Sequence, residues 1–142
     1  MPRFRMAAPA PAETDIHAAV ADALAVLLLP PAAWTTSPAG HVALPPAVAA
    51  KLARLGLKRG IPDVLIWHGG RSYGIELKRR GGRLSRTRTV RTRHGALRVV
   101  EGQTETFPRL EAAGMQIAVC ETVPAVLAAL AEWGVPVRRW AV

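Results

Sequence analysis

Residues 60–78 read Gly60-Ile-Pro-Asp-Val-Leu-Ile-Trp-His-Gly-Gly-Arg-Ser-Tyr-Gly-Ile-Glu-Leu-Lys78. Two apolar runs flank Gly69-Gly70, a pattern that predicts a β-hairpin whose tight turn needs positive φ at both glycines. If these glycines are the central residues of the turn, Val64 lies opposite Ile75. The same register places Asp63 opposite Glu76.

Charged residues interrupt both apolar runs of this hairpin. Because side chains alternate between the two faces of a strand, Asp63, Glu76 and Lys78 are expected on one face. The other face is expected to carry the core, formed by Val64, Ile66, Tyr73, Ile75 and Leu77. The alternative is that Asp63 merely begins a strand and the charges form a solvated polar face. A different turn length would also remove this register.

The charged face of the hairpin has the residue types of a divalent-metal site. Two opposed carboxylates repel each other unless a cation lies between them. Carboxylate oxygens are hard ligands that suit Mg²⁺ or Mn²⁺, which often keep water and substrate phosphate in their shell. A lysine beside such a metal can orient a water and offset charge on a phosphate. The face therefore predicts metal-assisted phosphodiester hydrolysis.

Composition narrows the class of protein. The chain has 142 residues, of which 50% are hydrophobic and 20% charged, as expected for one globular domain. Its formal net charge of +9 favours a polyanionic partner, usually nucleic acid and sometimes an anionic membrane surface. The single cysteine, Cys120, excludes a disulfide within the chain and favours a reducing compartment.

The N-terminal segment superficially has the order of a secretory signal. Met1-Pro-Arg-Phe-Arg5 is basic and Ala23 to Leu29 is apolar, but Glu13, Asp15 and Asp22 interrupt the pattern. The apolar run is also far shorter than the roughly 20 residues that span a bilayer. The sequence therefore predicts a cytoplasmic protein with no membrane partner.

The spacing of apolar residues and the positions of Pro and Gly predict a mixed α/β domain with a small central sheet flanked by helices. Residues 1–11, rich in Pro and Ala, are expected to form a flexible arm, and residues 12–142 a single domain. Helices are expected at 13–29, 46–56, 104–113 and 124–133, strands near 32 and at 115–121, and a second hairpin at 87–100 around His94-Gly95. Residues 135–142 are expected to add an edge strand or to pack against the domain.

Positive charge is concentrated after the first hairpin. Nine basic residues and no acidic one lie between Lys78 and Arg98. Residues 86–102 are interpreted as a basic insertion whose arginines contact DNA phosphates without reading sequence. The expected contacts are Arg79, Arg80, Arg83, Arg86, Arg88, Arg91, Arg93 and Arg98. No aromatic residue lies among them, so base stacking is not expected; the alternative is a solvated charged face.

Pro62-Asp63, followed thirteen positions later by Glu76-Leu77-Lys78, resembles the signature of the PD-(D/E)XK nucleases. Gly60-Ile-Pro-Asp-Val-Leu, Gly74-Ile-Glu-Leu-Lys-Arg, Gly82-Arg-Leu-Ser85 and Gln103 are similar to the VRR-NUC branch of that superfamily, and the likeness extends over most of the chain. It implies a restriction-endonuclease-like α-β-β-β-α-β core and a divalent metal. It also implies cleavage of DNA, often branched DNA such as four-way (Holliday) junctions, by proteins that are commonly homodimers.

The resemblance also implies roles for individual residues. Asp63 and Glu76 would be metal ligands together with the Leu77 carbonyl, and Lys78 the catalytic lysine. Gln103 would hold the lysine or a metal-bound water. Glu13 would reach the site from the first helix, although a glutamate is also simply favourable in a first helical turn.

One departure from the family pattern affects Gln103. The family's glutamine usually follows the Leu-Ser pair within a few residues, whereas here residues 86–102 intervene. Either the insertion is a hairpin arm or Gln103 is the wrong glutamine. Pro108 adds a second difficulty, since it lies in the helix that should carry Gln103 and either kinks it or forces a later start.

Two other functions compete with a nuclease. The chain could be a DNA-binding module on the same fold without cleavage, or a basic structural domain in which the charges of the hairpin are incidental. Asp63 and Glu76 count against the binding module, because two carboxylates facing DNA phosphates repel them unless a metal is bound.

Overall fold

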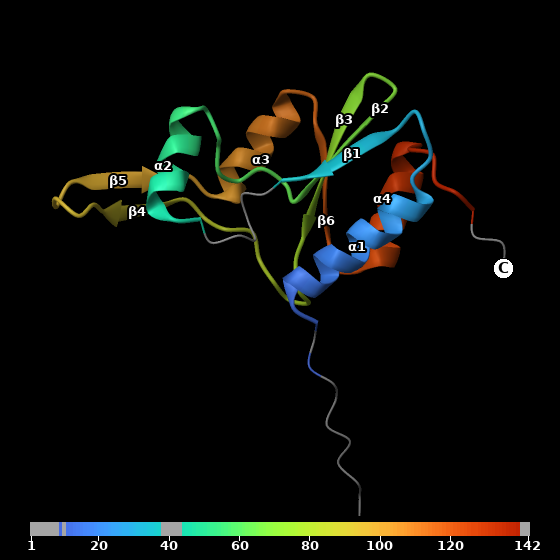
Figure 1. The fold of residues 1–142 in the computed structure, drawn as a ribbon, viewed down its shortest axis with the longest axis horizontal. Coiled ribbons are helices and arrows are strands. Elements are labelled where there is room, and N and C mark those ends of the chain that lie inside the picture. The colour runs from blue at the N-terminus through green and yellow to red at the C-terminus, as the bar shows by residue number, and fades with distance from the viewer. Residues whose placement is uncertain (1–8, 10, 38–43, 140–142) are drawn as a thin grey trace, which may run out of the picture.

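The computed structural model describes residues 9, 11–37 and 44–139. In this part of the chain, four helices accompany a four-stranded mixed sheet of order β1-β2-β3-β6 and a separate two-stranded sheet, β4-β5. The predicted mixed α/β class is confirmed (Figure 1). The predicted flexible arm falls outside the described residues, apart from 9 and 11.

The hairpin that opens the sheet has the predicted register. Strand β2 (Val64–His68) pairs antiparallel with β3 (Arg71–Leu77), and Val64 lies opposite Ile75. Gly69 and Gly70 form the turn with φ of 60° and 76°, values that other residues rarely adopt. The predicted core face is also confirmed, because all its members are 0–2% exposed: Val64, Ile66, Tyr73, Ile75 and Leu77.

Two further strands complete the sheet. β1 (Ala33–Thr36) pairs antiparallel with β2, and β6 (Gln116–Cys120) pairs parallel with β3. A parallel pair needs a crossover connection, which α3 (Gln103–Ala112) provides. Pro108 lies inside this helix without ending it, and α3 begins at Gln103, so the later start, one of the two alternatives for Pro108, is wrong.

Helices cover both faces of the sheet (Figure 1). α1 (Glu13–Leu27) and α4 (Val123–Trp133) pack together on the core face, where Val20, Leu24, Val126 and Leu130 are at most 1% exposed. α3 lies on the opposite face, which carries Glu76. The charged side of the hairpin therefore faces α3, away from the helices that pack on the core face.

Local signals explain the ends of α1 and α4. The Thr122 hydroxyl accepts a hydrogen bond from the Ala125 N–H at 3.2 Å, and Gly134 ends α4 with φ of 73°. α1 ends at Leu27, two residues before the predicted end. Leu28 instead forms a β-bridge with Val137, which fixes the C-terminal segment against the end of α1.

The remaining elements lie together at one side of the main sheet (Figure 1). They are α2 (Pro46–Arg54), none of whose residues is buried, and the hairpin of β4 (Arg88–Arg91) and β5 (Leu97–Val100). Arg91 lies opposite Leu97, so the predicted second hairpin is confirmed. No helix in the described ranges is long and apolar enough to cross a membrane.

Candidate functional site

The candidate site forms where β2 parts from β3. The chain bends before β2 so that Pro62 crosses over Gly74, where a Cβ would lie only 2.6 Å from the Pro62 Cγ. The strand pairing therefore ends at Val64 and Ile75 and does not continue to Asp63 and Glu76 as the simple register predicts. Because β3 extends beyond β2, its last residues need another partner.

Asp63 supplies that partner with its side chain. The Leu77 N–H donates to the Asp63 Oδ2 at 2.8 Å, while the Asp63 carbonyl accepts from the N–H of Ser37, the residue after β1, at 2.8 Å. The N–H and C=O of one strand residue point to the same edge. The Leu77 carbonyl therefore faces the edge that carries the Asp63 carboxylate, as the predicted ligand set of Asp63, Glu76 and Leu77 requires.

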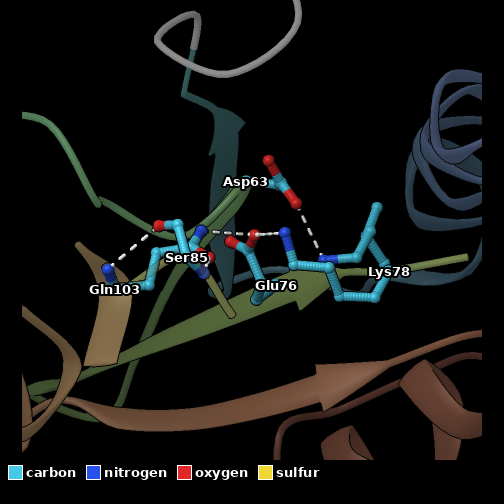
Figure 2. Close-up of polar contacts among 6 residues, drawn as sticks. Asp63, Glu76, Lys78, Ser85 and Gln103 are labelled. Carbon is cyan, nitrogen blue, oxygen red and sulfur yellow. Dashed lines mark hydrogen bonds and ion pairs between the residues drawn. The ribbon is translucent and has the colours of Figure 1, made fainter. Parts of the chain in front are cut away.

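Glu76 is the centre of the cluster (Figure 2). Its side chain is 3% exposed, and its Oε1 lies 3.0 Å from the Lys78 Nζ. Gln103 donates to the same oxygen from Nε2 at 2.5 Å. The other oxygen, Oε2, is buried and has no hydrogen-bond partner among the described residues. The structure therefore brings Asp63, Glu76, Lys78 and Gln103 together, as predicted.

The electrostatics of the cluster favour an additional cation. Burial raises the pKa of Glu76, and the negative charge of Asp63 raises it further, while Lys78 and Gln103 act in the opposite direction. The largest effect is the loss of water around a charged carboxylate. A positive ion next to Oε2 would replace that lost solvation and separate the two carboxylates.

Gln103 is oriented by Ser85, a residue for which no role was predicted. The Gln103 Oε1 accepts from the Ser85 N–H at 3.0 Å, so its amide nitrogen must face Glu76. In return, the Ser85 hydroxyl accepts from the Gln103 N–H at 3.1 Å, and the Ser85 carbonyl accepts from the Thr104 N–H at 3.1 Å. Ser85 thus caps the first turn of α3 from outside the helix.

This contact explains how Gln103 can lie so far from the Leu-Ser pair in sequence. Residues 86–102 are here called the basic arm. The arm begins directly after Ser85, and its last residue, Gly102, lies next to Ser85 again. The Gly102 N–H donates to the Thr87 hydroxyl at 3.0 Å. The ends of the basic arm are so close that a Cβ on Gly102 would lie 2.3 Å from the Arg86 carbonyl carbon. Gln103 bonds to Glu76 and not to Lys78, which was one of the two roles expected for it; the other, holding a metal-bound water, stays a prediction.

An open groove of about 820 Å³ leads to this cluster. We call it the carboxylate groove, after Glu13, Asp63 and Glu76 in its lining. Glu13 begins α1 and lines the groove, as predicted. A Cβ on Gly82 would lie 3.5 Å from the Glu13 Oε1 and 3.3 Å from the Lys78 Cβ, so Glu13 lies near Lys78.

The predicted arginines divide into two groups. Arg86 and Arg88 line the carboxylate groove and Arg98 lines a second, adjoining cavity. The other five are exposed outside both cavities: Arg79, Arg80, Arg83, Arg91 and Arg93. The groove also contains Lys58 and Arg59, which the sequence did not single out although they directly precede the Gly-Ile-Pro-Asp segment.

The number and type of ligand groups in the cluster limit the kind of metal site that it can form. Within residues 9, 11–37 and 44–139, no three His, Cys, Asp or Glu side chains lie close enough to hold a metal by themselves. The predicted set needs only two carboxylates and a carbonyl, with water and substrate phosphate completing the shell, a pattern typical of Mg²⁺. The buried, unpartnered Glu76 Oε2 fits such an ion.

Comparisons with known proteins give no relative. A scan against protein-family models, a search of curated proteins and a search of solved structures each found no match.

Proposed function

We propose that this chain is a metal-dependent DNA nuclease that uses Mg²⁺ or Mn²⁺ to hydrolyse phosphodiester bonds in structured DNA, such as four-way junctions. One observation carries the proposal above all. The Glu76 carboxylate has a buried oxygen without a partner among the described residues, and it lies beside Asp63 and Lys78. The groove around it is lined by four further basic side chains together with Glu13 and Glu101. Buried carboxylate oxygens are usually hydrogen-bonded, and a bound cation would satisfy this one.

The order of the elements supports a restriction-endonuclease-like fold of the VRR-NUC type. Without α2 and the β4-β5 hairpin, the chain reads α1, β1, β2, β3, α3, β6, followed by α4. This is the α-β-β-β-α-β order that the resemblance implies. Asp63 precedes the second strand of that order, and Glu76 and Lys78 end the third, where that family keeps its acidic residues and lysine.

The residues of the site divide the chemistry between them. Asp63, Glu76 and the Leu77 carbonyl would hold the ion, which when bound would place positive charge next to the phosphate under attack. Lys78, with a side chain only 13% exposed, is placed to hydrogen-bond a phosphate oxygen or the attacking water. Gln103 keeps the Glu76 carboxylate in one orientation, since its own amide is fixed by Ser85.

The basic surface supports DNA as the substrate. All eight arginines predicted to contact DNA are exposed, and none of them forms an ion pair within the described part of the chain. Unneutralised arginines around a groove repel one another unless an anion is bound. Phosphate contacts of this kind position a nucleic acid by its backbone and shape.

A DNA-binding module on the same fold, without cleavage, is the alternative. The basic arm favours it as strongly as it favours a nuclease. The buried Glu76 distinguishes the two, because a carboxylate that faces phosphates weakens DNA binding by charge repulsion unless a cation lies between them. The binding module therefore predicts that Glu76→Gln strengthens DNA affinity with or without metal.

The experiment that tests the proposal incubates the protein with labelled four-way junction, flap, duplex and single-stranded DNA in Mg²⁺, Mn²⁺ or EDTA. Asp63→Ala and Lys78→Ala should each lower cleavage by about 100-fold or more. Glu132→Ala, which removes an exposed charge from α4, is the matched control and should cut normally. Cutting in EDTA, or equal cutting by all variants, would refute the proposal.

A further inference from the structure

A second cavity of about 420 Å³ adjoins the carboxylate groove and has no role in the chemistry described above. It lies between the loop before β2, the end of β5 and α3. We call it the second cavity, and its lining includes Lys58, Arg59, Ile61, Arg98, Arg109 and Leu110. Its position and its chemistry both point to a ligand.

The charge of the second cavity is strongly positive. Four cationic side chains line it, from Lys58, Arg59, Arg98 and Arg109, and Glu101 is the one carboxylate in its described lining. Glu101 is already bonded to Arg109 at 2.9 and 3.0 Å. This bidentate pair holds Arg109 in place and leaves the guanidinium with further N–H donors. The other three cations remain to attract an anion.

The lining is also apolar in part. Ile61, Val100 and Leu110 are half-buried and present aliphatic surface next to the cations. A free phosphate would use only the cations, whereas a nucleotide would use both kinds of surface. The volume of the second cavity lies within the range of about 300–1,000 Å³ that is typical of small-ligand pockets. A nucleotide in a stacked duplex cannot place its base there unless it leaves the stack.

The second cavity and the carboxylate groove are continuous. Five residues line both of them: Lys58, Arg59, Ile61, Val100 and Glu101. A DNA strand that crosses the carboxylates can therefore enter the second cavity without leaving the protein surface. We infer that the second cavity receives one unpaired nucleotide of the bound strand, with its phosphate on the cations and its base on the aliphatic side chains.

This inference rests on the proposed function in so far as the strand is DNA bound in the carboxylate groove. It gives that function a substrate class, namely DNA that carries an unpaired nucleotide close to the bond that is cut. A continuous duplex would fill the groove but leave the second cavity without a base.

Binding with Ca²⁺ in place of Mg²⁺ tests the inference apart from cleavage. Two DNA ligands are compared, a blunt duplex and the same duplex with a short single-stranded extension carrying 2-aminopurine. We expect tighter binding of the extended duplex and a change in 2-aminopurine fluorescence. Arg98→Gln and Lys58→Gln should each reduce that preference by about tenfold, the size of one charge-assisted contact.

Arg93→Gln is the matched control, since it removes the same charge from the turn of the basic arm outside both cavities. It should weaken the binding of both DNA ligands equally and leave the preference for the extended duplex unchanged. Equal binding of both ligands, or a preference lost equally in Arg93→Gln, would overturn the inference. Displacement of the extended DNA by equimolar free mononucleotide would overturn it as well, because the site would then serve a free nucleotide. If the protein prefers the extended duplex but does not cleave DNA in Mg²⁺, this inference is supported and the proposed nuclease activity is refuted.

Discussion

Substituting Gly102 by Ala tests whether the closed basic arm holds the site together. Gly102 has φ of −99° and ψ of 172°, an extended conformation that alanine adopts without strain. The only obstacle is space, because the new Cβ would lie 2.3 Å from the Arg86 carbonyl carbon and 2.5 Å from the Ser85 carbonyl oxygen. Both are backbone atoms and cannot rotate away.

The size of the effect follows from these distances. A carbon–carbon contact is comfortable at about 3.5 Å, so the two ends of the basic arm must separate by about 1 Å. The bonds that join Ser85 to Gln103 and Thr104 are 3.0–3.1 Å long and would break. At about 1 kcal/mol for each bond, the loss is about 2–4 kcal/mol, or roughly 7–13 °C in Tm.

Thermal unfolding and metal-dependent cleavage are the two assays. Gly95→Ala is the control in the turn of the same arm, where φ is 81° and a Cβ would meet nothing within 4 Å. It should lower Tm through backbone strain alone and leave cleavage unchanged. Gly102→Ala should lower both, because Gln103 would no longer orient Glu76. Equal cleavage by the two variants would contradict the role given to Ser85 and Gln103.

Three further predictions concern the arm, the core and the cysteine. Replacing residues 86–102 by a short glycine linker should leave a folded protein whose DNA affinity is lower and depends less steeply on salt, as measured by titrations at several salt concentrations; an unchanged salt slope would show that the arm holds no phosphates. Leu130→Ala should cost about 2–5 kcal/mol in urea unfolding because the side chain is fully buried, whereas Leu55→Ala, with 73% exposure, should cost less than about 0.5. Burial raises the pKa of the Cys120 thiol, so a thiol reagent should react with the native protein only at higher pH than with the unfolded chain; equally fast labelling of both would contradict that burial.

The hairpin register was predictable because it depends on a local signal. Gly69-Gly70 fixes the turn, the turn fixes the pairing, and strand alternation then decides which side chains are buried. The proximity of Asp63, Glu76 and Lys78 follows from the same signal. The bend at Asp63 was not predictable, because it depends on Pro62 packing across the sheet onto Gly74.

The hydrogen bonds between Ser85 and Gln103 also could not be predicted from the pattern of residues. It forms only because the basic arm closes on itself, and closure depends on the absence of a side chain at Gly102. The basic lining of the groove was only partly anticipated. Counting charge along the sequence found Arg86 and Arg88 but missed Lys58 and Arg59, which a loop distant in sequence brings to the same place.

Binding of Mn²⁺ to the purified protein, followed by electron paramagnetic resonance, tests whether Asp63 and Glu76 hold a metal. We expect saturable binding that Asp63→Asn and Glu76→Gln each weaken by at least about tenfold, since even the loss of a residue that only supports a ligand costs about 10–100-fold in metal affinity. Glu132→Gln, which changes an exposed carboxylate on α4, should bind as the unmodified protein does. Mn²⁺ binding that is equal in all these proteins would contradict the assignment of Asp63 and Glu76 as metal ligands.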